Sequence, residues 1–169
     1  MSEAHKKEAP KSVRCKVITV SDTRTAETDK SGQLMRNYLE NAQHQVTVYE
    51  IVKDEQHVIW QAIDSGLKNA EVDAILLNGG TGIAKRDVTI EVVEHMMDKA
   101  IPGFGEIFRM LSYQDDIGSA AILSRATAGV VENKAVFATP GSSGAVKLAM
   151  ERLIIPELGH VVREIRKDL

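Results

Sequence analysis

The residues best suited to chemistry lie in a glycine-rich stretch in the middle of the chain. A short apolar run, Ala74–Leu77, leads into Gly79-Gly80-Thr81-Gly82, and Lys85-Arg86-Asp87 follow before a segment of helical periodicity. This order is typical of a strand, a tight turn and a helix. Glycines let the backbone approach a ligand closely, and the amide groups at the start of a helix favour an anion. Phosphate is therefore the predicted ligand of this turn.

The charged residues beside the turn strengthen this prediction. Lys85 and Arg86 can hold phosphate oxygens, and Asp87 can hold the accompanying metal ion. The stretch is not a P-loop, because Ala84 or Lys85 stands where the second glycine belongs, and a dinucleotide-binding fingerprint would need glycine at Lys85. For the glycines alone, the alternative interpretation is structural, a tight exit from a buried strand.

Three further polar stretches follow apolar runs of strand length. They are Ser21-Asp22-Thr23, Lys53-Asp54-Glu55 and Pro140–Gly144. Ligands of parallel α/β sheets lie off the carboxyl ends of the strands, so we expect these stretches to join Gly79–Asp87 in one composite site. Asp22, Asp54 and Asp87 also fit an alternative role as turn residues and helix caps.

The elements that must position these residues alternate along the chain. Strands are predicted over 15–21, 46–52, 74–77 and 134–139, each followed by helical periodicity, and Asp29 or Ser31 can cap the first helix. Ile117–Ala126 has no clear assignment, and Pro156 restarts the chain for a last helix. Repeated strand-then-helix units predict an α/β fold with a mostly parallel sheet covered by helices on both faces.

Composition narrows the class of protein. The 169 residues are 43% hydrophobic, which predicts a single domain over 13–169 preceded by a flexible tail over 1–12. A net charge of −3 predicts neither a nucleic-acid partner nor a membrane surface. The single cysteine, Cys15, excludes an internal disulfide, and the scattered histidines argue against structural zinc. Without a signal peptide or an apolar run near ~20 residues, we expect a cytoplasmic protein.

The residues alone predict a phosphorylated ligand. Two glycine turns beside helix starts offer places for phosphate, and the nearby aspartates offer oxygen ligands for Mg²⁺. Ser142 and Ser143 do not form a nucleophile elbow of the G-x-S-x-G type. Phosphoryl or nucleotidyl transfer needs no protein nucleophile, because the protein mainly positions the reactants and neutralises charge.

Six motifs, in order and spacing, make the chain similar to a known family. They are Ser21-Asp22-Thr23, Asp54-Glu55-Gln56, Gly79-Gly80-Thr81-Gly82 with Arg86-Asp87-Val88-Thr89, Pro102-Gly103-Phe104-Gly105-Glu106, Ile122-Leu123-Ser124-Arg125 and Pro140-Gly141-Ser142. Together they resemble the MoaB/MogA family of molybdenum-cofactor biosynthesis, from about Val13 onward. Phe108–Ser112 and Pro140–Ala145 resemble the MoaB branch in particular.

The resemblance implies a fold, a reaction and a set of site residues. The implied fold is a three-layer α/β/α sandwich that binds molybdopterin, a pterin dithiolene with a terminal phosphate. MogA-like members use Mg-ATP to adenylylate that phosphate and release pyrophosphate. Asp54 and Asp87 match the catalytic, Mg²⁺-holding carboxylates, and Arg86 would stabilise phosphate charge. The residues implied to bind substrate are Ser21, Asp22, Gly79, Gly80, Thr81, Gly82, Arg86, Ser124, Pro140, Gly141 and Ser142.

Partners and rival functions follow from the same resemblance. It implies a homo-oligomer, trimer or hexamer, and other molybdenum-cofactor pathway proteins as partners. The apolar residues that would supply contact, or else fill the core, are Phe104, Phe108, Met110 and Tyr113. The alternative function is a non-catalytic carrier or scaffold that binds molybdopterin or a nucleotide without releasing pyrophosphate. A dinucleotide-dependent reductase is disfavoured by the missing third glycine.

Overall fold

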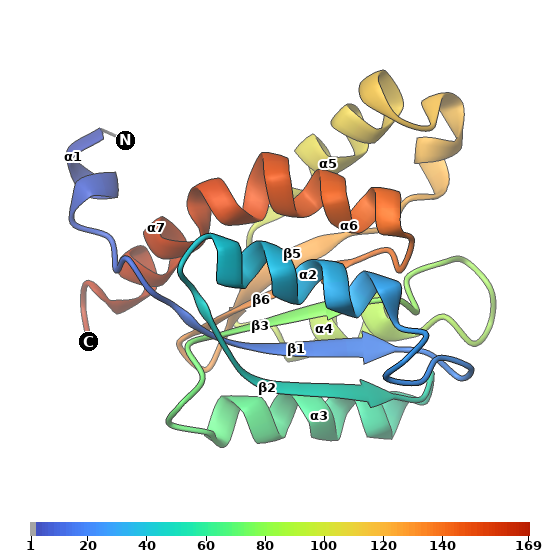
Figure 1. The fold of residues 1–169 in the computed structure, drawn as a ribbon, viewed down its shortest axis with the longest axis horizontal. Coiled ribbons are helices and arrows are strands. Elements are labelled where there is room, and N and C mark those ends of the chain that lie inside the picture. Colours follow the sequence, from blue (N-terminus) through green and yellow to red (C-terminus); the bar gives the residue numbers. More distant parts are fainter. Residues whose placement is uncertain (1–2) are drawn as a thin grey trace.

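A six-stranded sheet forms the middle layer of the protein, whose computed structural model describes residues 3–169 (Figure 1). The strands are β1 (Arg14–Val20), β2 (Gln45–Val52), β3 (Ala74–Asn78), β4 (Lys99–Ala100), β5 (Thr127–Val131) and β6 (Lys134–Thr139). They stand in the order β2-β1-β3-β6-β5-β4. β2, β1, β3 and β6 run parallel, whereas β5 runs antiparallel to both β6 and β4.

Helices cover both faces of the sheet and complete a three-layer sandwich (Figure 1). One face packs against α2 (Lys30–Asn41), α5 (Pro102–Asp115), α6 (Ser143–Ala149) and α7 (Ile155–Arg166). The other face packs against α3 (Gln56–Lys68) and α4 (Thr89–Met96). The predicted α/β fold, with a mostly parallel sheet between two layers of helices, is confirmed.

Central strand β3 explains why the sequence is apolar just before the glycine turn. All five of its residues are buried, because β1 and β6 flank it and helices lie above and below it. Strands covered on both faces read as continuous apolar runs rather than as an alternation. The buried strand ends at Asn78, directly before the glycine turn.

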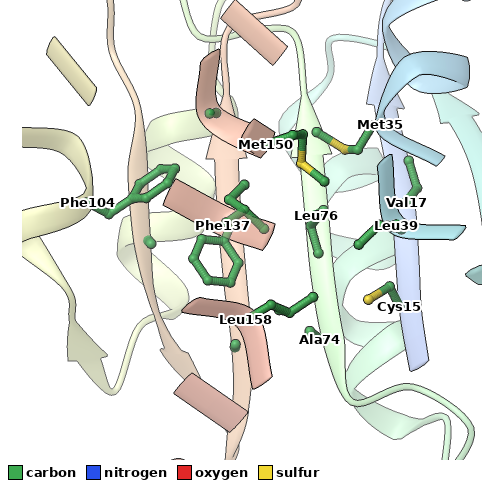
Figure 2. Close-up of a cluster of buried hydrophobic side chains, with 14 of the residues drawn as sticks. Cys15, Val17, Met35, Leu39, Ala74, Leu76, Phe104, Phe137, Met150 and Leu158 are labelled. Carbon is green, nitrogen blue, oxygen red and sulfur yellow. The ribbon is translucent and has the colours of Figure 1, made fainter. Parts of the chain in front are cut away.

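The larger core lies between the sheet and the layer of α2, α5, α6 and α7. Figure 2 shows Leu76 and Phe137 of the sheet in this buried cluster with Met35 and Met150 of the helices. The ring of Phe137 meets that of Phe104 edge-on, with centroids 5.4 Å apart and planes at 73°. Such edge-to-face pairs stabilise a core beyond their buried area, so α5 is held firmly against β6.

Parts of the architecture were not predicted. Ile117–Ala126, which the sequence left unassigned, contains a 3₁₀ helix over Gly118–Leu123, and strands β4 and β5 add an antiparallel edge. A π-helical turn over Met150–Ile154 joins α6 to α7, so the chain stays helical where Pro156 was expected to restart it. The Ile155 N–H donates to the Met150 carbonyl, one residue before the proline that has no N–H.

The N-terminal segment carries a short helix, α1 (Glu3–Lys7), beside α7. Ion pairs join Lys6 to Glu157 and Glu8 to Arg163. Residues 1 and 2 of the predicted tail lie outside the described residues, and the flexibility of the tail stays a prediction. Within residues 3–169, no helix is long and apolar enough to cross a membrane.

Two aromatic residues of α5 provide a test of this packing. Phe108 is fully buried, whereas Tyr113 on the same helix is 60% exposed. Phe108→Ala should lower the free energy of unfolding by roughly 3–5 kcal/mol, because it leaves a cavity in the core. Tyr113→Ala is the matched control and should change it by less than about 0.5 kcal/mol. Urea unfolding measures both, and equal losses would contradict the placement of α5.

Candidate active site

A cleft of about 550 Å³ opens at the carboxyl ends of β1, β3 and β6. Segments far apart in the sequence meet there, as expected for a composite site of a parallel sheet. The predicted residues that line it are Ser21, Asp22, Asp54, Gly79, Gly80, Thr81, Gly82, Asp87, Ser124, Pro140 and Gly141. Its walls also include Val20, Thr23, Arg24 and Leu123.

At the cleft, the backbone of Gly79 packs closely against the backbones of neighbouring strand ends. Gly79 has a φ of +94°, and its N–H donates to the Thr139 carbonyl over 3.0 Å. A Cβ at Gly79 would lie 2.2 Å from the Val20 carbonyl oxygen, and a Cβ at Gly141 would lie 3.0 Å from the Gly79 Cα. Gly79 is therefore required by space and by its left-handed backbone, whereas a Cβ at Gly141 would make a tight contact.

Gly80 brings two side-chain oxygens together. Its carbonyl accepts the Thr89 N–H at 3.0 Å, which places the first residue of α4 beside the turn. A Cβ on Gly80 would lie 2.4 Å from both Asp54 Oδ1 and Thr89 Oγ1, so these oxygens lie within twice that distance of each other. Both are buried and have no hydrogen-bond partner in the described part of the chain. Orphaned polar atoms of this kind indicate a place for a ligand, an ion or water.

The electrostatics of Asp54 follow from this setting. Burial, followed by the nearby charges of Asp22 and Asp87, raises the pKa of its carboxyl, and Arg86 opposes the shift. Desolvation and like charge both disfavour the ionised carboxylate. A positive charge placed next to Asp54 would relieve both effects.

Asp22 and Arg86 neutralise each other at the rim. Arg86 Nε and Nη2 donate to the two carboxylate oxygens of Asp22 over 2.8 and 3.0 Å, and the Asp54 N–H donates to Asp22 Oδ1 over 3.1 Å. These hydrogen bonds, first that of Arg86, lower the pKa of Asp22. Arg86 itself is not among the residues that line the cleft.

Asp87 both shapes the turn and borders the cleft. Its Oδ2 accepts the Ala84 N–H over 3.0 Å, while its own N–H donates to the Ala84 carbonyl over 3.0 Å. The same oxygen would lie 2.6 Å from a Cβ on Gly82, so the carboxylate closes over the glycine turn. The alternatives of turn residue and site residue are thus both compatible with its position.

Serines at the strand ends act mainly on backbone. Ser142, a predicted substrate-binding residue, does not line the cleft; its Oγ accepts the Ala145 N–H over 3.2 Å and caps α6. Ser21 Oγ accepts the N–H groups of Thr23 and Arg24 over 3.2 and 3.1 Å. The Ser21 hydroxyl therefore stabilises the loop after β1, and Ser21 also borders the cleft.

Two arginines of the site had no predicted role. Arg125 donates to the carbonyls of Thr81 and Gly82 over 2.9 and 2.6 Å and pairs with Glu91, so it supports the glycine turn from outside. Arg24 lines the cleft itself. The signal for each was its place in the sequence, Arg125 directly after the Ser124 of a motif and Arg24 directly after Ser21-Asp22-Thr23.

The carboxylates suit a magnesium ion held jointly with a ligand. Within residues 3–169, no three His, Cys, Asp or Glu side chains form a ready metal site. Mg²⁺ does not need one, because it commonly uses one or two carboxylates together with phosphates and water. Asp54 Oδ1, buried and without a partner, and the carboxylate of Asp87 fit that pattern.

Comparisons with known proteins agree with this geometry. The family described as probable molybdopterin binding domain matches residues 16–160. Molybdenum cofactor biosynthesis protein B of Bacillus subtilis (strain 168) is 68% identical over 166 residues, covering 98% of each chain. A crystal structure of molybdenum cofactor biosynthesis protein B has a TM-score of 0.92 at 60% identity and covers 95% of this chain and 99% of that chain. The tungsten cofactor synthesizing protein MoaB from Pyrococcus furiosus has a TM-score of 0.79 at 37% identity, covering 94% and 99%.

The crowding at Gly79 can be tested against a second glycine. Gly118 also has a positive φ, +61°, but nothing lies within 4 Å of a Cβ there. Gly118→Ala should cost about 1 kcal/mol of stability, because only the left-handed backbone is penalised. Gly79→Ala should cost roughly 1–3 kcal/mol more, because the new methyl group meets the Val20 carbonyl. Chemical unfolding compares the two, and equal costs would show that the strand ends are not tightly packed.

Because the pKa of Asp54 is raised, replacing this residue should increase the stability of the protein in a pH-dependent way. An ionised carboxylate with a raised folded-state pKa costs stability above that pKa, and the cost vanishes below the unfolded value of about 3.9. Asp54→Asn should therefore stabilise the ligand-free protein near neutral pH, with the gain disappearing as the pH falls through this window. Asp22→Asn should instead destabilise the protein near neutral pH, because the pKa of Asp22 is lowered. This loss should disappear as the pH falls from about 3.9 through the lowered pKa. Urea unfolding across pH measures both, and an Asp54→Asn variant less stable at neutral pH would contradict the assignment.

Proposed function

This chain belongs to the family of probable molybdopterin binding domains, as its resemblance to the MoaB branch predicted, and we propose that it acts in molybdenum cofactor biosynthesis. We infer that it binds molybdopterin in the strand-end cleft and adenylylates the terminal phosphate with Mg-ATP, releasing pyrophosphate. The observation that carries this proposal is the meeting of the Gly79–Gly82 turn with Asp54 and Asp87 on the walls of one cleft.

The glycine turn supports phosphate binding. Gly80, Thr81 and Gly82 border the cleft directly, so their backbone can approach a phosphate without interference from large side chains. The turn leads into α4, whose first residue, Thr89, donates its N–H to the Gly80 carbonyl. Gly79 and Gly80 both have positive φ values, which glycine adopts readily, so the chain turns sharply beside the cleft.

Asp54 and Asp87 would hold the magnesium ion. When bound, Mg²⁺ would supply positive charge that neutralises the phosphates of the nucleotide. The unpartnered Asp54 Oδ1 and the raised pKa of its carboxyl both favour a cation at this position. Arg125 holds the carbonyls of Thr81 and Gly82 from outside and so keeps the turn in place.

The reaction asks the protein to position two phosphorylated molecules. An oxygen of the molybdopterin phosphate forms a bond to the α-phosphorus of ATP, and the bond from that phosphorus to the β-phosphate bridging oxygen breaks, so that pyrophosphate leaves with the bonding electrons. The attacking phosphate is largely deprotonated at neutral pH, because its second pKa is about 6. No protein nucleophile is required, and orientation within the cleft supplies the main advantage.

Binding without transfer is the second candidate function. The ion pair between Asp22 and Arg86 favours it. Arg86, the cation expected to stabilise charge during transfer, is already paired and is not among the residues that line the cleft. A carrier or scaffold needs the cleft but not that charge. Pyrophosphate release distinguishes the two candidates.

The surroundings of the protein are proposed on the same basis. We infer a cytoplasmic homo-oligomer, a trimer or hexamer, that works with other proteins of the pathway. Met110 and Tyr113 on α5 are exposed and suit a contact between copies, whereas Phe104 and Phe108 are buried in the core. Exposed apolar side chains gathered on one helix are a common feature of such contacts.

The test is pyrophosphate release by the purified protein with molybdopterin, ATP and Mg²⁺, beside an Asp87→Asn variant. We expect release that depends on molybdopterin and falls by roughly 10²-fold or more in the variant, because asparagine lacks the charge but still accepts the Ala84 N–H. Molybdopterin binding should change little. Release that is equal in both proteins would remove Asp87 from the chemistry, and binding without release in the parent would favour the carrier.

A further inference from the structure

Arg24 brings a guanidinium group to the wall of the cleft. It lies in the loop after β1 and is about one third exposed, with a side-chain exposure of 32%. The charged side chains on the cleft wall are Asp22, Arg24, Asp54 and Asp87. Within the described residues, Arg24 is thus the cation among the residues that line the cleft, since Arg86 faces Asp22 at the rim.

Backbone contacts fix the Arg24 guanidinium beside the second glycine turn. Arg24 Nη2 donates to the Gly141 carbonyl over 2.9 Å, and Ser31 Oγ donates to the same oxygen over 2.5 Å. Gly141 is the residue whose backbone touches Gly79. The guanidinium therefore sits next to the point at which both glycine turns meet.

A buried carboxylate sets the orientation of Arg24 from behind. Arg24 Nη1 lies 3.6 Å from Asp29 Oδ1, and the Asp29 side chain is fully buried. Asp29 caps α2 by accepting the Gly32 N–H over 3.0 Å, and its other oxygen accepts the Tyr49 hydroxyl over 2.5 Å. Arg36 stacks 3.8 Å above the Tyr49 ring and holds it in place. These contacts fix the position of the Asp29 carboxylate, which limits the positions that Arg24 can take.

The chemistry of arginine matches the gap in the cleft. A guanidinium carries five N–H donors in a rigid fork. Nη2 donates one hydrogen bond to Gly141 and Nη1 lies near Asp29, while Nε makes no hydrogen bond within the described residues, so donors remain for a ligand. Planar donors of this kind bind phosphate in a bidentate manner. A cleft with carboxylates on its wall also needs a cation if it is to hold an anionic ligand.

We propose that Arg24 binds a phosphate group of the ligand beside Gly141, and that Asp29 and Tyr49 act as positioning residues for it. This proposal rests on the proposed function of the cleft and assigns to Arg24 the role that the sequence suggested for Arg86. The phosphate belongs either to the pterin or to the nucleotide. The rival explanation is that Arg24 only neutralises the buried charge of Asp29.

Direct binding measurements separate these explanations. Four variants are compared with the parent: Arg24→Met, Arg24→Lys, Tyr49→Phe and, as matched control, Arg152→Met. Arg152 lies on the π-helical turn and pairs with Asp115 of α5. The probes are molybdopterin, Mg-ATP and inorganic pyrophosphate. Each is titrated alone by calorimetry, so that no reaction takes place during the measurement. Thermal unfolding of each variant reports on the fold.

The expected result is selective. Arg24→Met should weaken the phosphate-bearing probe that occupies this position by roughly 10- to 100-fold, because a hydrogen-bonded charge pair is lost. Arg24→Lys should recover part of the affinity, and Arg152→Met should leave it unchanged. Loss confined to molybdopterin assigns the pterin phosphate, and loss confined to Mg-ATP and pyrophosphate assigns the nucleotide. Tyr49→Phe should weaken the same probe by a smaller factor.

Several results would overturn the proposal. They are unchanged affinity for every probe in Arg24→Met, an equal loss in Arg152→Met, or a parent protein that binds none of the probes. A variant with lower thermal stability but full affinity would assign Arg24 to the neutralisation of Asp29. The outcome is separate from that of the proposed function, because selective loss of binding can occur in a protein that releases no pyrophosphate, and release can occur without any role of Arg24.

Discussion

The close approach of three strand ends at Gly79 is the constraint on which the site depends. The Gly79 N–H reaches the Thr139 carbonyl at the end of β6, and its Cα faces the Val20 carbonyl at the end of β1 with no room for a side chain. Gly141 packs against it from the next turn. Because these parallel strands are neighbours in the sheet, their carboxyl ends lie at one edge, and the loops that follow them border a shared cleft.

Charge is distributed over this cleft in a way that follows from the same geometry. Asp54 is half-buried beside the like charges of Asp22 and Asp87, and its buried Oδ1 has no partner in the described residues, so this carboxylate is suited to a cation. Asp22 is already neutralised by Arg86, while Arg24 is held next to Gly141 by the buried Asp29. A ligand that carries both phosphates and magnesium would satisfy these groups together, which is the physical reason why we propose Mg-ATP and a phosphorylated pterin as the ligands of the cleft.

The sequence was informative where local pattern decides structure. The run before Gly79 predicted β3, because a strand buried on both faces needs continuous apolar residues, and the position of polar residues after each strand predicted the composite cleft. Pattern could not show the partner of a flexible side chain. Arg86 pairs with Asp22, a residue far away in the sequence. Arg24 lies at the cleft beside Asp29 and the Gly141 carbonyl, and the sequence pattern does not show these contacts. Strand β5 was missed because Thr127-Ala128-Gly129 is a weak strand signal that only its pairing with β6 makes regular.

The central claim is that one cleft holds both reactants, and a crystal structure with molybdopterin, Mg²⁺ and a non-hydrolysable ATP analogue tests it most directly. The account predicts both ligands over the Gly79–Gly82 turn, with the magnesium ion between their phosphates and the carboxylates of Asp54 and Asp87. Density for the nucleotide elsewhere, or for the pterin alone with the carboxylates unengaged, would contradict it.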